Sequence, residues 1–448
     1  MQPRRSFPVL SRVLLLVVAA AVLSSGCNPG TTPAARALHY LKAGQVKTPV
    51  KCLVDGRWVI DYPGDWPQYF HVDELPWFGV REVSPFMVAF VHHALTYAIE
   101  ENAGRLGFTA GDIETAREMR RRAVTFMRRF ESRPGEPDSG TYGFWPYDED
   151  PCRPERPLAA LSLTLLVGPI FRGTRVPVNI DFFPSALAIF PDADDTATIY
   201  SALLAGALLD GGAGSSTPFE QFFADWRDTG RVPRRLNPPW LPPASGAFLT
   251  WLSYRNPPDD SIPNDVDLVV NANVLWSLAR HGRLDTPGVS ESVALINRVV
   301  EQGLHRTRFH EVSDYYPDNF AFHYCVSRAY AEGPVPELEA AARILAADVE
   351  RLAKRRADGT VYWGEESPHL ATAFALLTLL NVGGDPTTLR DGIAYLVAEQ
   401  DPVFGNWDEC VFFIGRSEGG FHFSWFSASL TTAMAFEALC RYELERDE

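Results

Sequence analysis

The stretch "FPDADDTATIY", from Phe190 to Tyr200, places three aspartates within four positions at the start of a predicted helix. Carboxyl groups this close together cannot all ionise at low cost, so one of them is expected to keep its proton and to serve as a general acid. Asp192, Asp194 and Asp195 also suit a second role, because carboxylates at a helix start accept hydrogen bonds from unpaired amides, which lowers their pKa values. The sequence leaves both interpretations open: a proton donor, or a well-capped helix.

These aspartates belong to a chain whose hydrophobic pattern is mainly helical. Apolar residues recur with a period near 3.6 in segments rich in alanine and leucine, separated by loops that contain Gly, Pro and Trp. We expect helices over 85–104, 112–131, 193–209, 265–281, 289–303, 317–331, 336–356, 368–383, 386–400 and from about 427 onwards. Alternation typical of strands is nearly absent, and 178–183 is the best short candidate. The predicted fold class is therefore all-α.

A second pattern is a glycine-aromatic loop next to an alanine- and leucine-rich helix, as expected for stacked helix pairs. "YLVAEQDPVFGNW" (395–407) shows it most fully, and "YLKAGQ" (40–45) with "GRW" (56–58) shows it with a longer gap. Together with "DADDTA" (192–197), these segments resemble the Asp-x-Asp-Asp-Thr-Ala and Gln-Trp motifs of squalene–hopene cyclases and related class II terpene cyclases. The resemblance implies a single (α/α)6 toroid, a ring of inner helices surrounded by outer helices. Protein prenyltransferase β-subunits share that fold.

The resemblance also implies roles for the acidic residues. In class II cyclases the central aspartate of the motif protonates an alkene or epoxide, and here that residue is Asp194, flanked by Asp192 and Asp195. In a toroid, the starts of the inner helices meet at one end of the central cavity. This arrangement adds the pocket candidates Asp265, Asp267, Asn271, Asn273, Asp318, His323, Glu366 and His369. The implied reaction is an acid-initiated isomerisation or cyclisation of a lipid alkene, with aromatic side chains facing the carbocation.

Two other functions fit the same residues. An acidic, aromatic toroid pocket also suits a carbohydrate-active enzyme, a glycoside hydrolase or polysaccharide lyase, because paired carboxyl groups can cleave a glycan. A non-catalytic lipoprotein that binds its ligand on this scaffold is the third possibility. "WDECVFF" (407–413) offers Asp408 and Cys410 as weak metal ligands, similar to the Asp-x-Cys pair of protein prenyltransferases. The motifs as a whole predict neither a bound metal nor a cofactor.

The N-terminus has the pattern of an export signal. Arginines precede the short apolar run 13–23, and "SSGC" (24–27) resembles the cleavage site of bacterial lipoproteins, in which the cysteine, here Cys27, is lipidated. We therefore expect 1–26 to be a signal peptide. The mature protein is then anchored to the periplasmic face of a membrane or to the cell surface. "RRSF" (4–7) leaves Sec and twin-arginine export both open.

Composition limits the remaining partners and the domain count. The net charge of −15 argues against nucleic acid, since phosphate binding needs basic patches. We expect one domain over 27–448, because the helical pattern continues unchanged after the proline-rich segment 229–264, which we interpret as an inserted loop. The expected partners are the membrane, through the N-terminal lipid, and a small-molecule lipid or glycan substrate.

Overall fold

The computed structural model describes residues 32–48, 50–54, 57–73, 79–132, 139–144, 191–209, 218–230, 238–252, 264–365, 367–416 and 422–446. The predicted signal peptide, Cys27, Glu366 and the strand candidate 178–183 lie outside these residues. Within them, every helix is too short or too polar to cross a bilayer.

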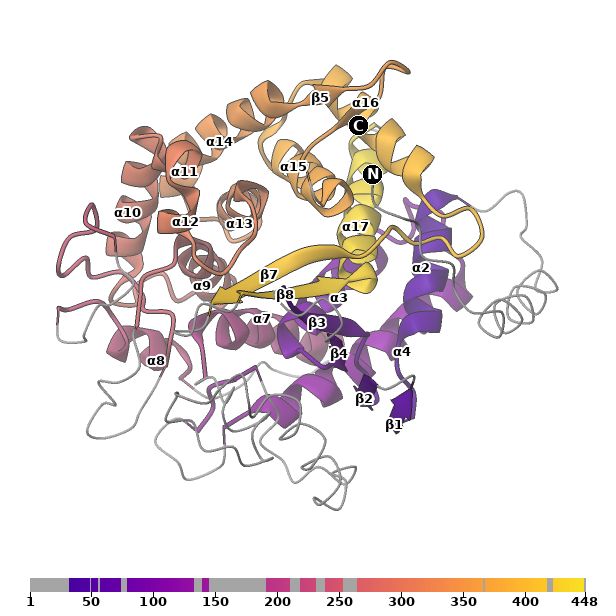
Figure 1. Ribbon diagram of the computed structural model, residues 1–448, viewed down its shortest axis with the longest axis horizontal. Coiled ribbons are helices and arrows are strands. Elements are labelled where there is room, and N and C mark those ends of the chain that lie inside the picture. The colour runs from indigo at the N-terminus through magenta and orange to yellow at the C-terminus, as the bar shows by residue number, and fades with distance from the viewer. Residues whose placement is uncertain are drawn as a thin grey trace.

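Six helices form a ring at the centre of the molecule (Figure 1). They are α3 (Pro85–Thr96), α7 (Ala193–Leu209), α9 (Leu268–Arg280), α13 (Asn319–Ala331), α15 (Pro368–Val382) and α17 (Ala428–Arg446). Each helix contacts the next in this order, and α17 contacts α3, so the ring closes. These helices are buried on nearly all sides; in α15 every residue from His369 to Leu380 is buried. Complete burial explains why alanine and leucine run through these segments without a polar face.

A second set of helices packs around the ring. They are α2 (Pro33–Gly44), α4 (Ala110–Met127), α10 (Val289–Glu301), α14 (Glu339–Leu352) and α16 (Pro386–Glu399), with the short helices α8 (Glu220–Asp225), α11 (Leu304–Thr307) and α12 (Phe309–Val312) and the single turns η1 (Tyr97–Glu101), η2 (Arg128–Phe130) and η3 (Pro336–Leu338). The longer ones are amphipathic: in α10, Val293 and Ile296 are buried and Arg298 is exposed. The helices expected from periodicity are confirmed, with ends displaced by a few residues.

Buried tryptophans tie the ends of outer helices to the loops that follow them. In each case the indole N–H donates to a helix carbonyl oxygen: Trp407 to Leu396 of α16 at 2.8 Å, Trp363 to Val349 of α14 at 2.7 Å, and Trp66 to Leu41 of α2 at 2.8 Å. Trp66 holds the place that the sequence pattern gave to Trp58, which lies in a strand instead. Gly64 permits this turn, because its φ is +97° and a Cβ there would lie 2.2 Å from the Arg122 carbonyl oxygen.

A six-stranded sheet corrects the all-α prediction. Its strands are β1 (Val50–Val54), β2 (Arg57–Asp61), β3 (Gln68–Val72), β4 (Gly79–Glu82), β7 (Cys410–Arg416) and β8 (His422–Ser427), in the order β1-β2-β4-β3-β8-β7; β5 (Lys354–Arg355) and β6 (Val361–Tyr362) form a separate hairpin. Burial alternates in β3, but over only five residues, and the adjacent aromatic residues of β7 show no alternation in polarity. Strands β7 and β8 lie across one end of the ring (Figure 1).

Candidate active site

The aspartate motif begins α7 and caps it. Asp192 Oδ1 accepts a hydrogen bond from the Asp195 backbone N–H at 2.7 Å, which confirms its predicted role as N-cap. The helix start is held from two sides: the Asp192 N–H donates to the Tyr142 carbonyl oxygen, and the Ala193 N–H donates to that of Thr250. Thr250 belongs to the described part of the proline-rich segment, so this segment helps to position the motif.

Asp194 points to Asn273 on α9, the next inner helix, and to Tyr316 in the segment just before α13. Its Oδ1 accepts from Asn273 Nδ2 at 2.6 Å, and its Oδ2 accepts from the Tyr316 hydroxyl at 2.5 Å. The orientation of the Asn273 amide is fixed from behind, because its Oδ1 accepts from Arg328 Nη2 at 2.5 Å. The two oxygens of Asp194 are therefore not equivalent: one faces a group that can only donate, and the other faces a hydroxyl that can donate or accept.

Burial sets the protonation of this motif. It raises the pKa of Asp194 to about 7; the nearby Asp192 adds to the increase, while the hydrogen bonds from Tyr316 and Asn273 oppose it. Burial likewise raises the pKa of Asp192 to about 6 and that of Asp195 well above the ordinary value. The hydrogen bonds that Asp192 accepts at the helix start do lower its pKa, as expected, but the loss of solvent raises the pKa by more. Asp194 is thus a carboxyl group that exchanges its proton near neutral pH.

A second pair of buried aspartates precedes α9. Asp265 accepts from the Tyr315 hydroxyl at 2.7 Å, and Asp267 caps α9 while also accepting from the Ser313 hydroxyl at 2.6 Å. Burial raises the pKa of both carboxyl groups to about 7. Asp265 and Asp267 therefore lie at the same end of the ring as Asp194, although neither lines the cavity described next, and each is protonated more readily than a free aspartate.

A narrow aromatic cavity opens beside the acid. Its lining comes from the starts of α3, α7 and α9, the segment before α13, the proline-rich segment and β7: Phe86, Phe144, Asp192, Asp194, Asp195, Thr250, Trp251, Val270, Tyr315 and Phe413. The room left for solvent is about 20 Å³, close to one water molecule. The Phe413 ring stacks on Tyr315 at 5.7 Å between centroids, so β7 closes this end of the ring.

Several predicted pocket residues serve other roles. Asn271 holds the proline-rich segment through both backbone groups of Phe248, and Asp318 caps α13 through the Phe320 N–H. His369 lies 3.6 Å from a carboxylate oxygen of Glu399 on α16. These side chains do not line the described cavity, because only one face of an inner helix looks into the ring and the others contact neighbouring elements.

His323 is also misplaced by the sequence prediction. It belongs to a buried cluster with His305 and Asp348, whose possible ligand atoms lie within 4.8 Å of one another. Asp348 Oδ2 is already engaged, by His305 Nε2 at 2.7 Å and by Arg306 Nε at 2.6 Å. Burial lowers the pKa of His323 to about 4, so its ring is neutral.

The weak metal candidates gain no support from the described residues. Asp408 is exposed, and the buried Cys410 thiol lies 3.6 Å from the Asp408 carbonyl oxygen rather than from its carboxylate. Neither residue belongs to the groups of ligand atoms that are close enough to share an ion in the described part of the chain.

The sequence analysis missed three polar contributors to the site. Tyr315 and Tyr316 stand side by side just before an inner helix, and Arg328 lies within an otherwise apolar helix. The signal was present in each case: hydroxyls at a helix start next to acidic residues, and a buried arginine that must find an acceptor. Neither tyrosine nor arginine is among the residue types, Asp, Glu, Asn and His, from which the sequence predicted the pocket.

Known proteins resemble the chain in structure and not detectably in sequence. No family model and no curated protein sequence matches it. The type II terpene cyclase MstE from Scytonema superposes with a TM-score of 0.50 at 13% identity, covering 91% of this chain and 96% of the cyclase. A variant of that cyclase in complex with geranylgeranyl dihydroxybenzoate gives 0.52 at 14% identity, covering 96% and 99%. An unsaturated glucuronyl hydrolase specific for heparin gives 0.41 at 11% identity, covering 93% and 97%, too low to support an argument. The chain has the α/α-toroid fold of the terpenoid cyclases.

Replacing Tyr316 by phenylalanine is expected to raise the pKa of Asp194 above about 7, because the lost hydrogen bond favours the ionised carboxylate. Infrared difference spectra, with Asp194→Asn subtracted, would follow the protonated carboxyl band against pH. Tyr315→Phe is the matched control, since that hydroxyl donates to Asp265 instead. An unchanged titration in Tyr316→Phe, or equal shifts in both variants, would show that Tyr316 does not tune the acid.

Proposed function

We propose that this protein isomerises or cyclises a lipid alkene by protonating it with Asp194. The observation that carries the proposal is a buried carboxyl group, with a pKa near 7, at the edge of a cavity with aromatic walls. A general acid works best when its pKa lies near the working pH. The terpenoid cyclase-like fold supports this class of reaction but does not establish it.

The hydrogen bonds support one position for the acidic proton. Asn273 can only donate towards Asp194 Oδ1, because Arg328 occupies the other end of its amide. The proton of the neutral acid is therefore carried on Oδ2, next to the Tyr316 hydroxyl. In the proposed step the Oδ2–H bond breaks, the alkene π electrons form the new C–H bond, and Asp194 is left ionised beside a carbocation. The cation then loses a proton from a carbon next to the charge, the electrons of that C–H bond form the new alkene, and water accepts the proton. Tyr316 and Asn273 then stabilise the carboxylate until solvent returns a proton.

The cavity walls favour a hydrocarbon over a glycan. Phe86, Phe144, Trp251 and Phe413 present ring faces that stabilise a nearby cation. The carboxyl groups are buried, and a sugar ring would need an open groove between two of them. Because the cavity now has room for about one water, substrate entry requires these aromatic side chains to move apart.

We further propose that the inner and outer helices form a complete (α/α)6 toroid around this cavity.

The proposed chemistry can be tested by isotope incorporation. Purified protein is incubated in D2O with squalene, farnesol or geranylgeraniol, and products are analysed by gas chromatography and mass spectrometry. If an acid starts the reaction, the product is an isomer of the substrate that contains deuterium from the solvent. One deuterium atom enters with each initial protonation. A product without deuterium would exclude Asp194 as the initiating acid. If none of the three polyprenes is converted, they are excluded as substrates, and a binding role is left.

The localisation of the protein is a separate proposal. We propose that 1–26 is removed and that lipidated Cys27 anchors the domain to a bacterial membrane, on the basis of the arginines, the apolar run and "SSGC". Membrane fractionation of Cys27→Ser tests this, because retention of the variant in the membrane would contradict it.

A further inference from the structure

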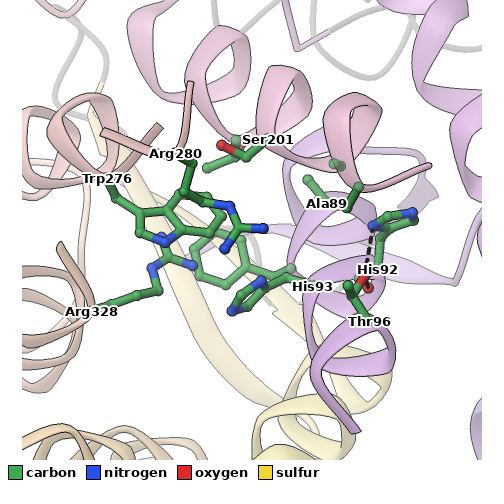
Figure 2. Close-up of a pocket in the computed structure, with 12 residues that line it drawn as sticks. Ala89, His92, His93, Thr96, Ser201, Trp276, Arg280 and Arg328 are labelled. Carbon is green, nitrogen blue, oxygen red and sulfur yellow. Dashed lines mark hydrogen bonds between the residues drawn. The ribbon is translucent and has the colours of Figure 1, made fainter. Parts of the chain in front are cut away.

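A second cavity lies deeper in the same ring. Figure 2 shows side chains from α3, α7, α9 and α13 converging on it, with Arg280, Trp276 and Arg328 on one side and His92 and His93 on the other. Seven residues of α7 separate Asp194 from Ser201, which lines this cavity. At 1.5 Å per residue, the two cavities are about 10 Å apart along the helix.

Hydrogen-bond donors without acceptors surround this second cavity. Apart from His93, whose Nε2 lies 3.0 Å from a Glu332 carboxylate oxygen, four lining side chains carry a buried polar atom without a hydrogen-bond partner: Trp276 Nε1, Arg328 Nε, Arg280 Nε and Ser201 Oγ. Trp276, Arg328 and Ser201 are each at most 2% exposed. A buried donor without an acceptor is destabilising, so four in one place favour the binding of an acceptor in this cavity.

The charges around the cavity are unbalanced towards the positive. The nearest carboxylates, Glu332 and Glu437, form ion pairs with Arg441 and with His93. Arg280 and Arg328 form no ion pair with a carboxylate among the described residues. Their guanidinium groups lie over aromatic rings instead, with that of Arg328 only 4.0 Å from the centre of Trp276. Aromatic faces, together with the more distant Glu332 and Glu437 in the case of Arg328, supply weaker compensation than a carboxylate in direct contact. Each guanidinium group also keeps an unpartnered Nε–H that can donate to an anion.

We propose that this second cavity binds an oxyanion, a carboxylate or phosphate group, between Arg280 and Arg328. Arginine presents parallel N–H groups that match two oxygens of such an anion, and Trp276 and Ser201 add further donors. One oxygen fits the present space of about 10 Å³, so a whole anion requires the partly exposed Arg280 side chain to shift outward while its guanidinium group stays in contact with the anion. The anion is either free in solution or the head group of a lipid whose alkene reaches Asp194; only this second source rests on the proposed function.

The site can be tested by binding, without reference to catalysis. The melting temperature is measured in sodium phosphate and in sodium acetate, against sodium chloride at equal ionic strength. We expect phosphate or acetate to raise it, by about 3 °C at a hundredfold excess over Kd. In Arg280→Gln, the anion concentration needed for the same rise in melting temperature is expected to be at least tenfold higher. Arg283→Gln, which removes the same charge from an exposed side chain paired with Glu220, should keep it. An absent response in wild type, or equal losses in both variants, would overturn the proposal.

A second measurement assigns the source of the anion. Farnesoic acid, farnesol and acetate are titrated against wild type and Arg280→Gln. A head-group site predicts that farnesoic acid binds at least tenfold more tightly than farnesol and acetate, and that Arg280→Gln removes this advantage. If acetate binds as tightly as farnesoic acid, and Arg280→Gln weakens both, the site takes a free anion. If Arg280→Gln changes the affinity of neither acid, the oxyanion site is wrong even where polyprene conversion succeeds.

Discussion

Asp194→Asn is expected to lower turnover of a lipid alkene by about 10³-fold or more, because asparagine keeps the shape and hydrogen bonds of the neutral acid and has no proton to give. Asn273 and Tyr316 can both remain bonded to the amide. Product formation at saturating substrate is the measurement. Asp318→Asn is the matched control, since Asp318 caps α13 outside the cavity lining and asparagine caps equally well. Equal turnover in wild type and Asp194→Asn would remove Asp194 from the mechanism.

The same substitution should stabilise the fold at alkaline pH. The folded-state pKa of Asp194, about 7, lies above that of an unfolded aspartate. The folded protein thus binds more protons, and the contribution of this group is fully present below about pH 4 and is lost as pH rises through 7. The Asp194→Asn variant lacks this loss. Its free energy of unfolding should therefore exceed that of wild type by an amount that grows between pH 4 and 7, to at most about 4 kcal/mol. Urea unfolding at pH 5 and pH 8 measures it, and a difference that shrinks with pH would contradict the assigned protonation.

Trp407→Ala is expected to give the largest loss of stability, about 3–5 kcal/mol, because it removes a tryptophan that is only 1% exposed and leaves a cavity. It also deprives the Leu396 carbonyl oxygen of its donor. Trp407→Phe should cost less, since most of the apolar contact remains and only the hydrogen bond is lost. Phe404→Ala, at a side chain 46% exposed in the same loop, should change the free energy of unfolding by less than about 0.5 kcal/mol. Comparable losses for Trp407→Ala and Phe404→Ala would show that Trp407 is not the tie between α16 and its loop.

The helices and the acidic motif could be predicted because their signals are local. The period of apolar residues identified the inner and outer helices, and the spacing in "DADDTA" identified both the start of α7 and its cap. The sheet could not be predicted in the same way. One of its pairings joins β3 to β8, more than 350 residues apart, and the strands are too short for alternation to emerge.

The candidate site divides along the same line. Asp194 and Asn273 were predicted as neighbours because a toroid brings the starts of its inner helices together. Whether another predicted residue joins them depends on the face of its helix that it occupies. Asn271, two residues from Asn273, faces the opposite way and holds a loop. Tyr316 and Arg328 act through hydrogen bonds across the ring, which a single sequence does not encode by spacing. The raised pKa of Asp194 depends on burial by all of these elements, so it is a property of the folded ring.

The closure of the ring by α17 has a consequence for biosynthesis. This last helix contacts α2, α3 and α15, and the strand that leads into it pairs with β3 near the beginning of the chain. Until residues 422–446 leave the ribosome, β3 is paired on one side only, with β4, and α3 has α7 but not α17 as a neighbour in the ring. The closed ring can therefore form only after residues 422–446 have been synthesised, and contacts between such distant segments make that step slow.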